Sequence, residues 1–327
     1  VLCLGLGVVA MALFSYIDYR FLRKLVWPGY LLCLVLLVLV LFSSPINGCR
    51  RWISFGGLTL QASEVAKFEM ILLTADIAAR TPQVKFGEVP LRKWVHHSIV
   101  VELIRPILWL VPVLILLVLE PHMSGILLTT AIVGTILMLT GCGPAPCQYT
   151  AAAAALLLKP ALTLVESIGY LQDRLNTWSD DLEALNDQTK QSLYAIGSGG
   201  LKGLGLGNSR QKYLYVPEPQ NDFIFAVVVE ELGLVGALMI LLIFALLVWR
   251  GITLSLRAKD KFGKLLGIGL TSQIGIQVVL NILVITDWLP NTGISLPFFS
   301  YGGSSLIMLL AQMGLVLSIS RTANIER

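Results

Sequence analysis

The amino-acid sequence predicts an all-α, polytopic integral membrane protein with nine transmembrane helices and one large extracytoplasmic loop. Charged residues make up 13% of the 327 residues and hydrophobic residues 56%, whereas soluble domains carry roughly 25% charged residues. The hydrophobic residues come in long runs, such as Val1–Ile17 and Val26–Phe42. Because one crossing of a bilayer needs about 20 mostly apolar residues, these runs are membrane spans and a water-soluble globule is excluded.

The nine spans are expected at residues 1–17, 26–42, 62–79, 106–120, 124–141, 148–165, 222–249, 265–286 and 304–320. The chain starts inside an apolar run, without Met or a basic n-region, which predicts that its beginning is missing. Its five cysteines are odd in number and several lie in or beside apolar runs, so we expect neither a disulfide framework nor a metal site built from them. The net charge of +4 is small and not gathered in a stripe, so no nucleic-acid partner is expected.

Lys and Arg in short loops predict the orientation, because cytoplasmic loops carry an excess of both. If the first span runs from outside to inside, 15 of the 24 Lys and Arg residues fall in cytoplasmic segments. Residues 43–61, 166–221 and 287–303 are then extracytoplasmic. The segment 166–221 is far longer than the usual connection of about 4–6 residues, and its Trp and Tyr residues favour an ordered, functional loop.

Asp222 opens the seventh span, at its outer end. A carboxylate is favoured at a helix N-terminus, which carries partial positive charge and unpaired N–H groups, so an ordinary cap is one interpretation. The other is a general base at the lip of a polar cavity. Position alone leaves the two interpretations equal.

Other polar residues lie within the spans, where they must face protein or water rather than lipid. Glu230 and Glu231 lie roughly 12 Å along the helix from Asp222; they either fix packing by pairing with Lys, Arg or a neighbouring helix's backbone, or line a pathway. Glu64 and Lys67, three residues apart on one helical face, are able to form an ion pair. Gln273, Gln277 and Asn281 form a polar stripe that either lines a cavity or joins helices.

Three outer segments have unusual sequences. Arg50 and Arg51 precede Trp52, which suits an interfacial belt or recognition of a pyrophosphate. The glycine-rich run at 197–207 lacks the Gly-Lys-Ser/Thr ending of a nucleotide loop, so we reject a nucleotide site and expect a flexible backbone close to the membrane surface or a ligand. Two prolines and several glycines at 290–303 predict an irregular re-entrant turn that lines the same cavity as Asp222.

Five motifs in order resemble those of the SEDS family (shape, elongation, division and sporulation; FtsW/RodA-like) over almost the whole chain. They are Asn47–Ile53, Leu60–Lys67, Ala195–Gly200, Pro217–Gly233 and Leu289–Ser305. The resemblance implies one SEDS-type transmembrane domain over residues 1–327, with ten spans in the family and the first of them absent here. The Asn47–Ile53 and Leu289–Ser305 motifs are somewhat closer to the FtsW and sporulation branch.

The resemblance also implies an activity, a substrate and partners. The expected activity is a peptidoglycan glycosyltransferase that polymerises lipid II at the outer face of the cytoplasmic membrane, for cell division or cell shape. Expected partners are a class B penicillin-binding protein transpeptidase and other divisome or elongasome membrane proteins. A divalent cation, Mg or Mn, is a possible cofactor with unassigned ligands. A lipid II flippase and a non-catalytic scaffold for the transpeptidase stay open as alternatives.

The family's proposed catalytic carboxylate falls on Asp222, which favours the general-base interpretation. Candidates for contact with the substrate are Arg50, Arg51, Lys202, Arg210, Lys212 and Glu218. Candidates for the cavity and its framework are Glu64, Lys67, Glu230, Glu231, Gln273 and Gln277. The chain departs from the family at Glu120–Gly125, where Gln-Pro-Asp-Leu-Gly-Thr is common, and at Gln61–Glu64, where Gln-Pro-Ser-Glu is common.

Overall fold

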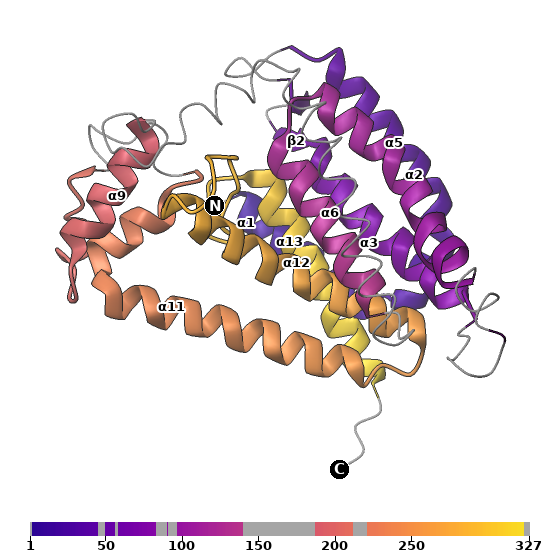
Figure 1. Cartoon of the computed structure of the whole chain (residues 1–327). Helices are drawn as coiled ribbons and strands as arrows, with labels where there is room; N and C mark the ends of the chain where they lie inside the picture. Colours follow the sequence, from indigo (N-terminus) through magenta and orange to yellow (C-terminus); the bar gives the residue numbers. More distant parts are fainter. Residues whose placement is uncertain are drawn as a thin grey trace. The chain divides into compact units, whose positions relative to one another are not determined.

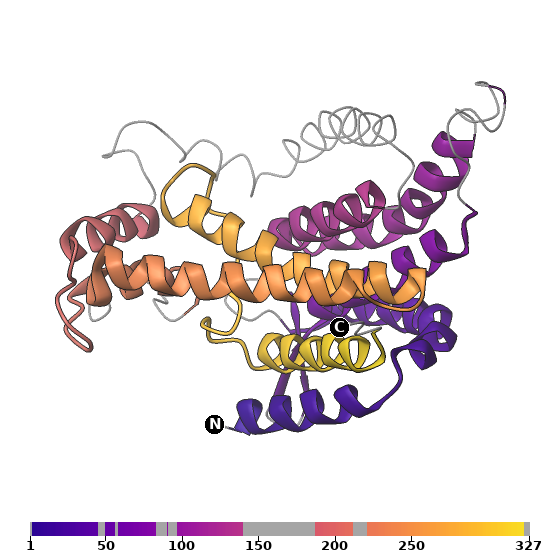
Figure 2. The same cartoon turned by 90° about the horizontal axis from the view of Figure 1, so that it is seen from below.

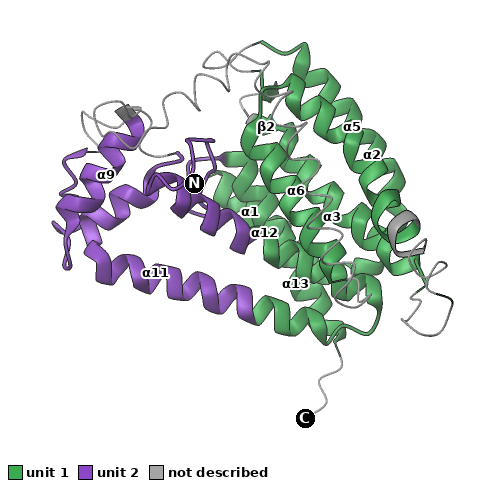
Figure 3. Ribbon diagram, viewed as in Figure 1, with its two compact units in different colours: residues 1–163, 250–273, 303–327 green, residues 164–249, 274–302 purple. Residues whose placement is uncertain are grey.

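The computed structural model describes residues 2–44, 50–55, 58–82, 90, 97–139, 187–211 and 221–323. The chain divides into two compact units (Figure 3): unit 1 comprises residues 1–163, 250–273 and 303–327, and unit 2 comprises residues 164–249 and 274–302. The predicted span 148–165 lies outside the described residues.

Unit 1 is a helical bundle with a short hairpin. Its elements are α1 (Leu2–Tyr16), α2 (Tyr19–Leu41), β1 (Trp52–Phe55), β2 (Leu58–Gln61), α3 (Ala62–Arg80), the π-helix η1 (His97–Ile104), α5 (Arg105–Leu119), α6 (Met123–Met138) and α13 (Gly303–Thr322). It also contains the end of α11 (Ile224–Leu256) and the first part of α12 (Lys261–Ile285). Helices α2, α3, α5 and α6 lie side by side (Figure 1). The two strands pair antiparallel, with Trp52 opposite Gln61, and lead directly into α3.

Helix α3 is the buried helix of unit 1. It contacts α2, α5, α6 and α13, and 15 of its 19 residues are buried. Its charged residues exclude it from the five helices, among the residues that the structure describes, that are long and apolar enough to be membrane spans by composition. The burial supports the predicted span at 62–79, because charged side chains in a membrane protein face the protein interior.

Ion pairs tie the Arg80 end of α3 to its neighbours. The buried Asp76 carboxylate lies 2.7 Å from Arg23 Nε on α2 and 2.8 Å from Arg80 Nε. The hydroxyl of Tyr19, at the start of α2, donates a hydrogen bond to Asp260, which precedes α12. These contacts explain why α2 begins at Tyr19 although apolar patterning predicted a span from residue 26.

Helices α1 and α13 pack closely along their lengths (Figure 2). Small residues permit this approach: a Cβ on Gly7 would stand 2.5 Å from the Leu310 side chain. Small residues at contacts between membrane helices let the backbones come together. Ser318 Oγ and Arg321 Nη2 donate hydrogen bonds to the carbonyl oxygens of Ile17 and Tyr16, at 2.7 and 2.9 Å.

Unit 2 contains α9 (Asp187–Gly199), the first part of α11 (Ile224–Leu256), the second part of α12 (Lys261–Ile285) and the irregular segment 286–302. Helix α11 is broken at Gly233, where φ is 69° and ψ is −178°. A positive φ is readily adopted by glycine because it has no Cβ.

The predicted helical spans agree with the described helices in type and order. The main differences are the ends: α2 starts seven residues before the predicted span, and α11 continues seven residues beyond residue 249. An apolar run marks the part of a helix inside the membrane, whereas the helix itself continues into polar residues. The structure also adds α9, which lies within the predicted outer loop 166–221.

Candidate active site

Asp222 lies in the turn that leads into α11, two residues before the first helical residue Ile224. Its side chain is partly exposed, whereas the next residue, Phe223, is buried. Phe223 therefore anchors the turn in unit 2, while Asp222 stays partly exposed.

Asn281 on α12 joins this turn to the irregular segment 286–302. Its Nδ2 donates to the carbonyl oxygen of Asp222 at 2.8 Å and to that of Ile294 at 2.7 Å. The side chain is fully buried. Asn281 thus positions the Asp222 backbone against the segment that carries Gly293.

Further hydrogen bonds fix the irregular segment. Gln277 Nε2 donates to the carbonyl oxygen of Ser295 at 3.0 Å, and Ser300 Oγ donates to that of Asn221 at 2.7 Å. Asn291 Nδ2 donates to Gln188 Oε1 on α9 at 2.9 Å. The predicted irregular turn at 290–303 is confirmed over its unit 2 part. Side chains of the same unit bind several of its backbone groups, as irregular backbone in a membrane protein needs.

The Asp222 carboxylate lies beside Gly293. A Cβ at residue 293 would stand 3.2 Å from Asp222 Oδ2, and Gly293 has a φ of 74°. Both the contact and the backbone conformation therefore favour glycine. Gly293 belongs to the irregular turn that was predicted to line the same cavity as Asp222, and its contact with the carboxylate agrees with that prediction. Asn281 was predicted only as part of a polar stripe, and its bond to Asp222 was not expected.

Glu230 and Glu231 bind the glycine-rich loop. The buried Glu230 carboxylate accepts hydrogen bonds from Ser209 Oγ at 2.5 Å and from the Arg210 N–H at 3.1 Å. Glu231 accepts from the Gly207 N–H at 3.0 Å. Among the described hydrogen bonds, the donors belong to this loop and to Ser198 of α9, whose Oγ lies 3.4 Å from Glu230 Oε1. Both carboxylates therefore fix packing as predicted, although these donors differ from the predicted Lys, Arg or helix backbone, because the loop folds back over the break in α11.

Unit 1 holds a separate polar group at the start of α3. Lys67 Nζ lies 2.8 Å from Glu64 Oε1, and both residues are buried, so the predicted pair is confirmed. Arg51 Nη2 donates to the carbonyl oxygen of Pro121, in the turn between α5 and α6. Arg50, which is exposed, donates from Nη1 to the carbonyl oxygen of Leu41 at 3.0 Å.

The α5–α6 turn contains the departure from the family motif. Glu120 and His122 are both buried. Burial, together with the positive charges of Arg51 and Lys67, lowers the pKa of His122 well below its ordinary value, so the imidazole is neutral near pH 7. The α5–α6 turn thus places a neutral His122 close to the charges of Arg51 and Lys67.

Other candidate residues are placed as follows. Lys202 and Arg210 are exposed on the glycine-rich loop. Gln273 is fully buried in α12, and among the described residues its amide has no hydrogen-bond partner. Lys212 and Glu218 lie outside the described residues.

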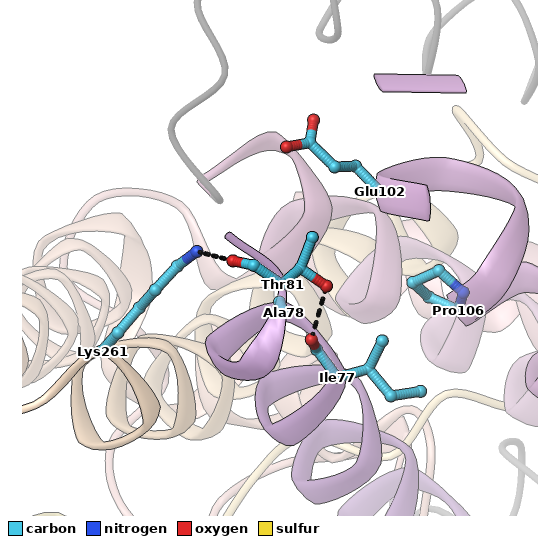
Figure 4. Close-up of a pocket in the computed structure, with 6 residues that line it drawn as sticks. All are labelled: Ile77, Ala78, Thr81, Glu102, Pro106 and Lys261. Atoms are coloured by element: carbon cyan, nitrogen blue, oxygen red, sulfur yellow. Dashed lines mark hydrogen bonds between the residues drawn. The ribbon is translucent and has the colours of Figure 1, made fainter. Parts of the chain in front are cut away.

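A small pocket in unit 1 lies at the C-terminal end of α3 (Figure 4). It is lined by Ile77, Ala78, Thr81, Glu102, Pro106 and Lys261. Lys261 Nζ donates to the carbonyl oxygen of Thr81 at 3.3 Å. This contact uses the lysine to cap the end of α3.

Within the described residues, no group of three or more His, Cys, Asp and Glu side chains is arranged to hold a metal ion. The predicted divalent cation therefore stays a prediction, and no chemical step is assigned to it below.

The fold and this site define a class of protein: a multi-pass, all-α membrane protein in which the turn before a broken helix carries a carboxylate against an irregular polar segment. The sequence profile of the FtsW/RodA/SpoVE family, described as cell cycle protein, matches residues 1–325. The chain belongs to this family, which confirms the SEDS resemblance.

Two curated relatives illustrate the similarity. The chain is 39% identical to stage V sporulation protein E of Bacillus subtilis, over 97% of this chain and 84% of that protein. It is 38% identical to the probable peptidoglycan glycosyltransferase FtsW of Geobacter metallireducens, over 96% of this chain and 82% of that protein.

Solved structures agree with the fold. One, described as "Structural coordination of polymerization and crosslinking by a peptidoglycan synthase complex", is 30% identical with a TM-score of 0.78, covering 99% of this chain and 89% of the other. The rod shape determining protein RodA of Thermus thermophilus is 30% identical with a TM-score of 0.69, covering 99% and 87%.

Proposed function

We propose that this protein is a peptidoglycan glycosyltransferase that polymerises lipid II, with Asp222 as its general base. The observation that carries the proposal is the partly exposed Asp222, whose backbone carbonyl is fixed by Asn281 and whose carboxylate lies beside Gly293. The similarity to proteins named probable peptidoglycan glycosyltransferase supports the reaction class.

The reaction needs a base and a leaving group. The 4-hydroxyl of the acceptor GlcNAc attacks C1 of the donor sugar, and the bond from C1 to the lipid pyrophosphate breaks. Asp222 takes the hydroxyl proton as the new bond forms. Direct attack inverts C1 and gives a β-linked glycan.

Negative charge develops on the departing pyrophosphate and needs cationic or hydrogen-bonding groups to stabilise it. Lys202 and Arg210 are exposed and belong to the same unit as Asp222. We assign them this role first. Arg51 is a weaker candidate, because its guanidinium already binds the α5–α6 turn.

The same proposal places Asp222 outside the cytoplasmic membrane, where the basic residues predict it. It also includes a class B penicillin-binding protein as partner. The similar structure of a complex that couples polymerisation to crosslinking supports a crosslinking partner.

The test compares glycan polymer made from purified lipid II by wild type and by Asp222→Asn at equal protein levels, with and without the transpeptidase. Asn has nearly the same size but cannot take the proton, so polymerisation should fall by about 10²–10⁴-fold while folding is retained. Asp18→Asn is the matched control, since Asp18 is an exposed helix cap and Asn caps about as well as Asp.

Near-equal polymer yields from wild type and Asp222→Asn would contradict the base assignment. Lipid II movement across proteoliposomes, with no polymer from either protein, would favour the flippase. Transpeptidase recruitment with no dependence on any single carboxylate would favour the scaffold.

A further inference from the structure

The glycine-rich loop is held rigidly against the break in α11. The N–H groups of Leu204 and Gly205 donate to the carbonyl oxygens of Glu230 and Glu231, both at 3.0 Å. In return, the Leu234 N–H donates to the carbonyl oxygen of Gly200 at 2.9 Å. The loop therefore pairs with backbone groups that the broken helix leaves open.

Glycines make this close approach possible. A Cβ on Gly203 would stand 2.6 Å from the backbone nitrogen of Gly233, and Gly203 has a φ of 76°. The side chains of Glu230 and Glu231 add the further hydrogen bonds to residues 207–210 described above. These backbone and carboxylate contacts hold the described part of the loop in place, whereas its predicted flexibility stays a prediction.

This rigid loop exposes leucines. Leu201 is 67% exposed and Leu206 77% exposed, and Leu204 is exposed between them. We call these three residues the leucine finger. Holding large apolar side chains in water is unfavourable, so their rigid display points to an apolar environment.

The length of α11 places the finger at a membrane boundary. From Leu234 to Leu256 the helix has 23 residues, or roughly 34 Å, which is enough to cross a hydrocarbon core of about 30 Å. The break at Gly233 is therefore at one membrane surface. The loop bonded to residues 230–235 lies at the same level.

The apolar surface continues from the finger onto α11. Leu234 and Val235, which follow the break, are exposed, as are Leu238 and Met239 one turn further on. These side chains belong to a spanning helix and face lipid. Exposed Lys202, beside Leu201, is suited to lipid phosphates, as basic residues at membrane interfaces commonly are.

We propose that the leucine finger inserts into the lipid surface on the Asp222 side of the membrane and anchors the break in α11 there. The finger thereby fixes the depth in the membrane of the break at Gly233. The part of α11 before the break, which begins at Ile224, follows directly after Asp222. The inference concerns membrane contact and does not depend on the polymerase activity.

The test uses the full chain with its five cysteines replaced, in vesicles of phosphatidylglycerol and phosphatidylethanolamine. Single cysteines at Leu204 or Leu206 carry an environment-sensitive fluorophore, and Asn208→Cys is the matched control on the same loop. We expect blue-shifted emission at residues 204 and 206, with several-fold stronger quenching by shallow acyl-chain nitroxide lipids than at residue 208. Aqueous iodide should show the reverse order.

Two results would overturn the proposal. The first is equal iodide quenching at residues 204, 206 and 208 with no quenching by the nitroxide lipids. The second is protection from both quenchers only after the transpeptidase is added, which would assign the finger to a protein partner. Leu206→Ser should retain folding and, with the label at residue 204, weaken lipid quenching if the leucines insert together.

Discussion

The carboxylate of Asp222 lies against the bare Cα of Gly293, so that a Cβ at residue 293 would stand 3.2 Å from Oδ2. Gly293→Ala should therefore displace the carboxylate in addition to straining a backbone with φ of 74°. Strain of this kind costs about 1–2 kcal/mol for an L-residue. The amount of glycan polymer made per folded protein should therefore fall, in addition to any loss of folded protein. Polymer yield and the amount of folded protein are measured on the same sample.

Gly207→Ala is the matched control for that prediction. Gly207 has a similar φ of 84°, and its added Cβ would meet nothing within 4 Å. Gly207→Ala should lower stability about as much as Gly293→Ala but should leave the polymer yield per folded protein unchanged. Equal specific activities for the two variants would show that crowding of Asp222 is unimportant.

The buried Glu64–Lys67 pair predicts that substitutions at its two residues have coupled effects on stability. Removing one partner of a buried ion pair leaves the other charge buried without a partner, which lowers the free energy of unfolding by about 3–5 kcal/mol. Lys67→Met should therefore lower the thermal unfolding temperature markedly, and Glu64→Gln with Lys67→Met should recover a large part of the loss. Thermal unfolding in detergent checks this, and additive effects of the two substitutions would show that the pair is not coupled.

The two neighbouring arginines should behave differently. Arg51→Ala removes a charge-assisted hydrogen bond to Pro121, and such bonds are worth about 1.5–3 kcal/mol. Arg50→Ala removes a contact at an exposed side chain and should change stability little. The unfolding temperature of each variant reports its stability, and its polymer yield at subsaturating lipid II reports substrate binding.

Arg51→Lys is the informative control, because it keeps the charge but loses the planar fork. Normal stability in Arg51→Ala, combined with weak use of lipid II, would contradict the structural role and favour pyrophosphate recognition.

The orientation is testable with single cysteines at exposed positions. In a cysteine-free background, Asn208→Cys should react with an impermeant maleimide in spheroplasts, and Lys259→Cys should react only after permeabilisation. The excess of Lys and Arg in the segment containing Lys259 is the physical reason. The opposite labelling pattern would invert the topology.

The membrane fold could be read from the chain because lipid imposes a simple requirement on sequence: each span needs a long apolar run. Even α3, with its five charged residues, was predicted as a span from its apolar residues, and Glu64 and Lys67 were expected to share one of its faces. Helix ends were less accurate because contacts such as Tyr19 with Asp260 extend a helix beyond its apolar run.

The site was only partly predictable. Asp222 stands out in the sequence as a carboxylate at a helix start, and the family resemblance marks the same residue. Its surroundings come from long-range pairing: Asn281 is 59 residues away and binds the Asp222 carbonyl, and Gly293 belongs to a segment that has no regular structure. Sequence patterns report local periodicity and burial. The closeness of Asp222, Asn281 and Gly293 depends instead on how α11, α12 and the irregular segment pack, and on hydrogen bonds to backbone groups, which leave no pattern in the sequence.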